Sequence, residues 1–193
     1  MRRSAALLAL FLAAAASAEP GAIVLVAKPE LADPNFSRAV VLVTRTPTGD
    51  TVGVVLNRPT RLRLAEVAPE FPRAAAYRDR LYAGGPVLQA VIVALFRSPA
   101  PPSAPAFQVL DDAYLSMHPD NINSLLERSP RGGWRLFAGF SGWAPGQLEA
   151  EIASDRWYVV PATEDLLFRQ ETSGMWRELI TRSRSRRAIY FPE

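Results

Sequence analysis

The 193-residue sequence contains no cysteine and a single histidine. Without cysteine the chain has no disulfide, no thiol nucleophile, no thiolate metal ligand and no N-terminal cysteine for lipid attachment. Zinc sites of the usual kind combine several His and Cys ligands, so His118 alone cannot build one. The acidic residues at Asp111, Asp112 and Asp120 lack the glycine and the terminal glutamate of a calcium loop. We therefore expect no metal and no cofactor.

Long apolar runs are scarce as well. The longest internal one, Val87–Phe96, is too short to cross a bilayer, which takes roughly 20 residues as a helix. The N-terminal run, residues 5–16, follows two arginines and precedes an Ala-Ser-Ala sequence that ends at Ala18. This arrangement is typical of a secretory signal peptide. We predict that residues 1–18 are a signal peptide cleaved after Ala18 and that residues 19–193 form one domain. The mature protein is then expected to be periplasmic or secreted, without a transmembrane segment.

An alternative for the N-terminal run is the hydrophobic first helix of a cytoplasmic domain. The run has no polar face, and an amphipathic surface helix would show one at a period of 3.6 residues. The signal peptide is therefore favoured.

Charge of either sign is modest. Lys28 is the only lysine, and loss of Arg2 and Arg3 with the signal peptide lowers the formal net charge from +3 to +1. Bulk charge would not hold such a chain to nucleic acid, so a nucleic-acid partner is not expected. Positive charge gathers near the C-terminus, at Arg177, Arg182, Arg184, Arg186 and Arg187. This stretch could contact anionic lipid or nucleic acid, but we favour a solvated tail ending in a short strand.

The order of apolar runs and turn residues predicts alternating strands and helices. Asp33 followed by Pro34 is typical of a helix start, and the remaining helices are expected at 119–127 and 147–153. Continuous apolar runs indicate buried strands, at 22–27, 39–43, 52–56, 91–96, 107–110, 134–140 and 157–160. Hairpin and helix-crossover connections together indicate an α+β (α/β mixed sheet) fold: a compact single domain whose largely buried mixed sheet is flanked by short helices.

Four segments, in order along the chain, resemble the YqgE/AlgH family. They are 29–41 (Pro-Glu-Leu-Ala-Asp-Pro-Asn-Phe-Ser-Arg followed by Ala-Val-Val), 53–59 (Gly-Val-Val-Leu-Asn-Arg-Pro), 84–87 (Gly-Gly-Pro-Val) and 139–149 (Gly-Phe-Ser-Gly-Trp-Ala-Pro-Gly-Gln-Leu-Glu). The resemblance implies a compact mixed α+β domain. It implies no activity, because the family has no established reaction; one branch is associated with transcriptional control of alginate production.

The sequence departs from that pattern at several polar positions. Thr46 stands where family members usually carry a histidine. Val91, Ile92 and Phe96 stand where an Arg, a Gly and a His are expected. A function that rests on those polar groups is therefore not expected in this chain.

The polar residues of the first two segments form the first candidate ligand site. They are Asp33, Asn35, Arg38, Asn57 and Arg58. Two arginine forks could bind a carboxylate or a phosphate. The alternative is an internal Asp–Arg pair, with Asn57 capping the end of a strand.

The fourth segment gives a second group of candidates, at Gly142, Trp143, Gln147 and Glu149. Free backbone N–H groups at the start of the 147–153 helix could hold an anion. Glu149 opposes this, because its own charge already complements the helix dipole.

Ser141 nearly matches a nucleophile elbow, but Trp143 replaces the final glycine and no histidine is close in sequence. We interpret it as a small residue in a strand-to-helix turn and assign no catalytic residue.

Three functions remain possible from sequence. The favoured one is a non-enzymatic binding or regulatory module outside the cytoplasm, acting on a protein or a small anionic ligand. The second is a hydrolase or transferase built on carboxylates such as Glu149 and Glu151. The third is a transcriptional regulator, which an export signal disfavours.

Overall fold

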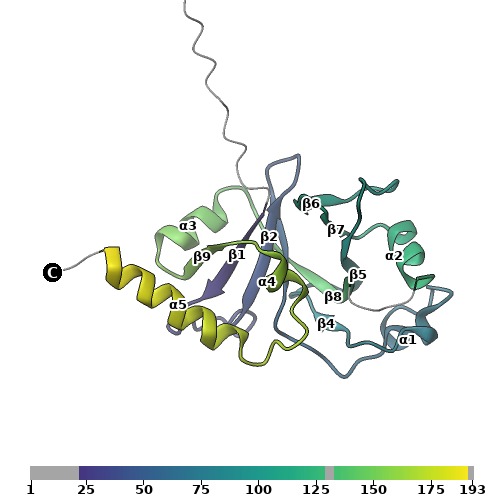
Figure 1. The fold of residues 1–193 in the computed structure, drawn as a ribbon, viewed down its shortest axis with the longest axis horizontal. Coiled ribbons are helices and arrows are strands. Elements are labelled where there is room, and N and C mark those ends of the chain that lie inside the picture. The colour runs from purple at the N-terminus through teal and green to yellow at the C-terminus, as the bar shows by residue number, and fades with distance from the viewer. Residues whose placement is uncertain (1–21, 129–132, 191–193) are drawn as a thin grey trace, which may run out of the picture.

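The computed structural model describes residues 22–128 and 133–190 (Figure 1). The predicted signal peptide, residues 1–18, lies outside the described residues. Within them, none of the helices combines the length and the apolar character needed to cross a bilayer.

One curled sheet of nine strands organises the described chain. Its strands run in the order β6-β7-β5-β8-β3-β2-β1-β9, and β4 lies beside β8. Every pairing is antiparallel except β4 with β8. The α+β class and the mixed sheet are thus confirmed, with one short parallel pair. The strands are β1 (Ala22–Ala27), β2 (Val40–Arg45), β3 (Thr51–Val55), β4 (Tyr82–Ala83), β5 (Val87–Arg97), β6 (Phe107–Leu110), β7 (Ala113–Ser116), β8 (Trp134–Trp143) and β9 (Trp157–Pro161).

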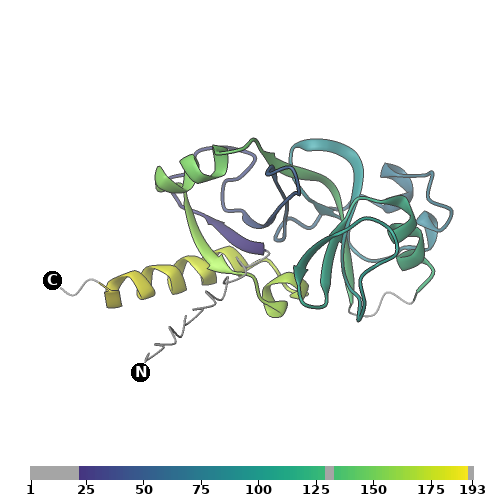
Figure 2. The same cartoon turned by 90° about the horizontal axis from the view of Figure 1, so that it is seen from above.

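Helices cover both faces of the sheet. They are α1 (Leu64–Val67), the 3-10 helix η1 (Ala74–Ala76), α2 (Pro119–Leu126), α3 (Gln147–Ala153), α4 (Glu164–Phe168) and α5 (Met175–Tyr190). Figure 2 shows α3 and α5 on opposite sides of β1, and Figure 1 shows α1 and α2 at the other end of the molecule.

The strand β1, which lies between β2 and β9, shows why its run is continuously apolar. Successive side chains of a strand point to opposite faces. Val24 and Val26 pack into a core shared with α4 and α5. Leu25 and Ala27 pack into a second core beneath α3. Because both faces are covered, no position on the strand is left for a polar residue.

Most predicted elements are present, with shifted bounds. The 147–153 helix is confirmed, and the 119–127 helix ends at Leu126. The strand predicted at 91–96 begins at Val87 and ends at Arg97. The strand β7 was not predicted.

Two predictions were wrong. Residues 34–38 form turns instead of a helix, since Arg38 adopts a left-handed φ of 56° that ends the turn and directs the chain into β2. The basic C-terminal stretch lies in α5, not in a tail with a short strand. Met175, Leu179 and Ile180 anchor that helix in the core, and arginine has a high helix propensity.

Candidate functional site

The loop between β1 and β2 is built on Asp33. Its side chain accepts a hydrogen bond from the Asn35 backbone N–H (Oδ1 to N, 2.7 Å). Its backbone carbonyl accepts bonds from the N–H groups of Phe36 (3.0 Å) and Ser37 (2.7 Å). Asp33 therefore closes a tight turn through its own side chain and carbonyl.

The neighbouring Asn57 and Arg58 hold that loop from the end of β3. Asn57 accepts a bond from the Val40 N–H (2.9 Å) and donates one to the Arg38 carbonyl (2.9 Å). The Arg58 guanidinium donates to the carbonyls of Asn35 and Ser37. Burial lowers the pKa of Arg58, and the charge of Asp33 acts in the opposite direction. The structure thus joins the backbone of this loop to the Asn57 and Arg58 side chains, with the Arg58 fork directed at backbone carbonyls.

Arg38 points elsewhere. Its exposed guanidinium lies over the Trp176 ring of α5, with the guanidinium carbon 5.8 Å from the ring centroid. Trp176 in turn donates its indole N–H to the Ala27 carbonyl (2.7 Å). The two arginines predicted to act together therefore make separate contacts.

In the second group, the central residue is one that the site prediction omitted. Glu151 on α3 accepts hydrogen bonds from the indole N–H groups of Trp143 (3.1 Å) and Trp157 (2.9 Å) on one oxygen. Its other oxygen accepts a bond from the Gln147 side chain (3.1 Å). Both indoles are buried, so the half-buried carboxylate compensates two donors that water could not reach.

Phe36 joins the two groups. Its ring stacks on Trp143 (centroids 5.5 Å apart) and meets Trp157 edge-on (5.6 Å). We call Phe36, Trp143 and Trp157 the aromatic cluster. It attaches the loop that follows β1 to β8 and β9, so residues far apart in sequence form one unit.

The remaining residues of the second group lie at the surface. Gly142 is exposed, and Glu149 forms an ion pair with Arg45 on β2 (2.6 Å). The helix α3 has seven residues, and the Gln147 side chain already accepts the Ala144 N–H (3.2 Å). Part of the donor set expected for an anion is therefore used within the chain.

Ser141 is not in a strand-to-helix turn. It is fully buried within β8, where it faces Gly53 in the ladder with β3, and it donates to the Gly84 carbonyl (3.1 Å). A Cβ on Gly84 would lie 2.1 Å from the Gly139 carbonyl oxygen, so glycine is required where these backbones cross. The serine fills a crowded interior position, where its hydroxyl is bonded within the chain.

His118 begins α2, away from this region (Figure 1). Its ring accepts a bond from the Asp120 N–H (3.3 Å). Asp120 is thus at the start of a helix, as predicted. Among the residues that the structure describes, no three His, Asp or Glu side chains gather as metal ligands.

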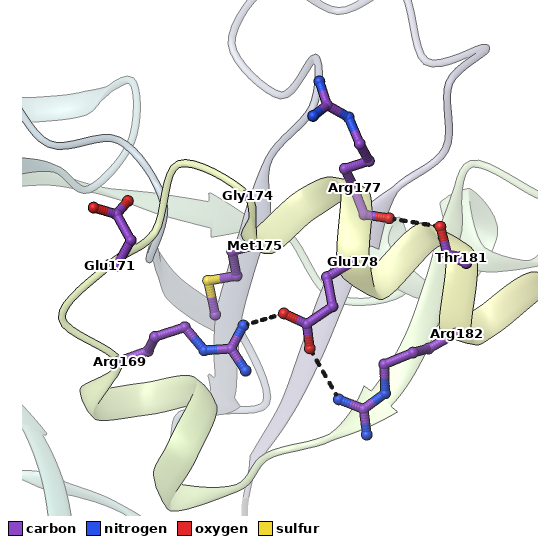
Figure 3. A pocket seen from close by; sticks show the side chains of 8 residues that line it. All are labelled: Arg169, Glu171, Gly174, Met175, Arg177, Glu178, Thr181 and Arg182. Carbon is purple, nitrogen blue, oxygen red and sulfur yellow. Dashed lines mark hydrogen bonds and ion pairs between the residues drawn. The ribbon is translucent and has the colours of Figure 1, made fainter.

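A cavity of about 610 Å³ lies beside the first turns of α5 (Figure 3). Its polar wall is a chain of ion pairs in which Arg169 binds Glu178 (2.6 Å) and Glu178 binds Arg182 (3.3 Å). Arg169 also binds Asp165 on α4. The hydrogen bond from Arg169 lowers the pKa of Glu178. Arg177 extends away from these pairs in Figure 3. No pattern in the sequence predicted this cavity, whose lining residues come from α5 and from the segment that connects α4 to it.

The described chain is a single α+β domain with a curled sheet. The residues of the four sequence segments contact one another within it. The chain belongs to the AlgH-like family, whose profile matches residues 24–187. The family resemblance seen in the sequence is thereby confirmed.

Relatives of similar length support this assignment. A UPF0301 protein of Thermobifida fusca is 37% identical over 166 residues, covering 82% of this chain and 84% of the relative. A UPF0301 protein of Mycobacterium avium is 35% identical over 179 residues, covering 89% and 87%.

Two solved structures share the fold. The solution structure of the AlgH protein from Pseudomonas aeruginosa is 26% identical with a TM-score of 0.68, covering 96% of this chain and 93% of that one. The crystal structure of protein DIP2367 from Corynebacterium diphtheriae is 28% identical with a TM-score of 0.64, covering 84% and 86%.

Proposed function

We propose that this AlgH-like protein is a non-enzymatic binding module that is exported and acts on a protein partner outside the cytoplasm. The proposal rests on the observation that polar side chains of the motifs form hydrogen bonds within the chain. Asn57 and Arg58 bind backbone groups of the loop after β1, and Glu151 accepts three donors of its own chain.

General acid–base catalysis needs a group that exchanges a proton with a substrate held within hydrogen-bond reach. Glu151 is poorly suited to this, because protonating it would disturb the bonds to Trp143 and Trp157. Glu149 is accessible, but it forms an exposed ion pair with Arg45. These contacts favour a scaffold role over the carboxylate-based enzyme.

The same contacts favour a protein partner over a small anion. The Arg58 fork would have to leave the carbonyls of Asn35 and Ser37 to bind a phosphate or carboxylate. Without the Arg58 fork, Arg38 would contribute a single exposed guanidinium, and one exposed charge binds an anion weakly.

The test uses the purified chain from residue 19 onward, incubated with a panel of ester, phosphate and glycosidic substrates. We expect no turnover above that of a heat-denatured sample. Turnover that is abolished in Glu149→Gln, while the free energy of unfolding stays unchanged, would replace this proposal with the carboxylate enzyme.

Export is tested separately. Residues 1–25 are fused to a reporter that is active only outside the cytoplasm, and Ala18→Arg, which removes the small residue before the expected cut, serves as the control. We expect an active, processed fusion that stays unprocessed in Ala18→Arg. A fusion that remains inactive would contradict the export part of the proposal.

A further inference from the structure

The curled sheet does not close into a barrel, and its two outermost strands, β6 and β9, border the gap. A cavity of about 660 Å³ occupies it. We call this cavity the seam. The end of β6 and the turn after it form one wall, and β9 with the start of β1 forms the other. β1 and β6 also approach each other, which brings the two walls of the seam close together.

On the wall formed by β9, the outer edge of the strand pairs with none of the strands that the structure describes. The Lys28 N–H donates to the Arg156 carbonyl (3.0 Å), so these two residues form a hydrogen-bonded pair next to the antiparallel ladder of β1 and β9. Hydrogen-bonded and non-hydrogen-bonded pairs alternate from there along the ladder. In this alternation residues 158 and 160 bond to β1, whereas the N–H and C=O of Val159 point away from it. An edge of this kind can pair with another strand.

The side chains of β9 do not protect that edge. Natural edge strands usually carry charged residues, a bulge or a proline that blocks pairing. The sequence of β9 is Trp-Tyr-Val-Val-Pro, so only Pro161, at its very end, blocks pairing. Val159 is 45% exposed, although it is a large apolar residue. Exposure of the Val159 side chain to water is unfavourable in free energy, and a strand bound to this edge would bury it.

The opposite wall is acidic. Asp111 and Asp112 form the turn between β6 and β7, and Glu164 at the start of α4 also lines the seam. Glu164 is paired with Arg97 (3.1 Å). For the two aspartates, the described residues supply no ion pair. The seam therefore combines an apolar strand edge with two carboxylates that lack a cationic partner.

We propose that the seam binds an extended peptide segment of a partner protein. The peptide adds to β9 as a new strand, its apolar side chains enter the cavity, and a Lys or Arg side chain meets Asp111 and Asp112. Main-chain bonds supply affinity and the side-chain pockets supply specificity in this mode of recognition. The inference rests on the proposed function, since it names the partner class of a binding module.

The charge pattern selects this occupant over a second copy of the chain. Pairing β9 with β9 of another copy would bury Val159, but the strand Trp157–Pro161 contains no basic residue to meet the aspartates. A peptide that alternates basic and apolar residues satisfies both walls.

The probes are two synthetic peptides with blocked ends, (Lys-Val)₄ and the charge-reversed (Glu-Val)₄. Binding to the ¹⁵N-labelled chain from residue 19 onward is followed by NMR. We expect (Lys-Val)₄ to bind about tenfold more tightly than (Glu-Val)₄, a difference of about 1.4 kcal/mol. We also expect slower exchange of the Val159 amide in the complex. The double variant Asp111→Asn, Asp112→Asn is expected to bind both peptides equally.

The matched variants are Val159→Lys, which protects the edge, and Leu62→Lys, which changes an apolar side chain of similar exposure (49%) elsewhere on the surface. Binding is expected to be lost in the first and kept in the second. Shifts that survive in Val159→Lys, or (Glu-Val)₄ binding as tightly as (Lys-Val)₄, overturn the proposal. So does sedimentation that shows a dimer with the Val159 amide protected, since the occupant is then a second copy. These outcomes leave the proposed function standing, because that proposal is tested by enzymatic turnover and by export of the reporter fusion.

Discussion

Replacing Glu151 tests whether the shared motifs serve the fold. In Glu151→Ala the indole N–H groups of Trp143 and Trp157 lose their acceptor. These residues are 3% and 4% exposed, so their donors remain largely shielded from water. An unsatisfied buried donor costs about 1–3 kcal/mol. Glu151 is half-buried, and water can enter part of the vacated space. We therefore expect the free energy of unfolding to fall by about 3 kcal/mol, in the lower half of the range of about 2–6 kcal/mol for two donors.

Two variants separate the hydrogen bonds from charge and from helix position. Glu151→Gln keeps an acceptor oxygen that both indoles can reach and loses only the charge, so we expect a loss of about 1 kcal/mol. Glu149→Gln changes a carboxylate on the same helix whose ion pair with Arg45 is exposed. It should cost about 0.5 kcal/mol or less.

The assay is urea unfolding of the chain from residue 19 onward, followed by tryptophan fluorescence, which reports on the aromatic cluster. Circular dichroism in the same solutions checks that the transition is two-state. An equal loss in Glu151→Ala and Glu149→Gln would refute the reasoning. So would a Glu151→Ala protein as stable as the parent, since the indoles would then need no acceptor.

Three further predictions concern neighbouring contacts. Phe36→Leu removes an aromatic ring that stacks on Trp143 while keeping an apolar side chain, and should lower the free energy of unfolding by about 1 kcal/mol, measured by urea unfolding. In Arg58→Lys the side chain has no planar guanidinium to bond the carbonyls of Asn35 and Ser37 at the same time. Amide hydrogen exchange in residues 34–38 should therefore speed up, while that of β8 stays unchanged. Arg169→Gln removes the main cause of the lowered pKa of Glu178, so that pKa should rise in a ¹³C NMR titration. A lowered folded-state pKa contributes stability above the unfolded-state pKa, and that stability is lost as the pH falls through the folded-state pKa. The acid-induced loss of stability should therefore be smaller in Arg169→Gln, and an unchanged Glu178 pKa would contradict the assignment.

Local pattern carried most of the secondary structure. The continuous apolar run of β1 indicated a strand covered on both faces, and both faces are covered. The turn glycine and proline residues and the helical spacing of Leu148 and Ile152 placed α3. The errors arose where the local pattern was ambiguous. Asp33-Pro34 is typical of a helix start, but one turn later Arg38 adopts a left-handed conformation. Arginine has no preference for that conformation, so the sequence did not predict it.

The strand β7 shows the same limit. Its four residues, Ala-Tyr-Leu-Ser, are too few to display a period, and only pairing with β5 and β6 makes them a strand. The helix α5 was read as a tail because its arginines dominate the local composition. Its apolar residues at 175, 179 and 180 matter only once the sheet offers them a surface.

By itself the sequence determined the family, the fold class and the grouping of motif residues, because these depend on residue types and their spacing along the chain. Only the tertiary structure decided which side chains meet. It placed Phe36 against Trp143 and Trp157, directed the Arg58 fork at backbone carbonyls, and brought β9 and two aspartates to the lining of one cavity. Such contacts depend on how the sheet curls and on which segments it brings together. The spacing of residues along the chain does not specify their distances in space.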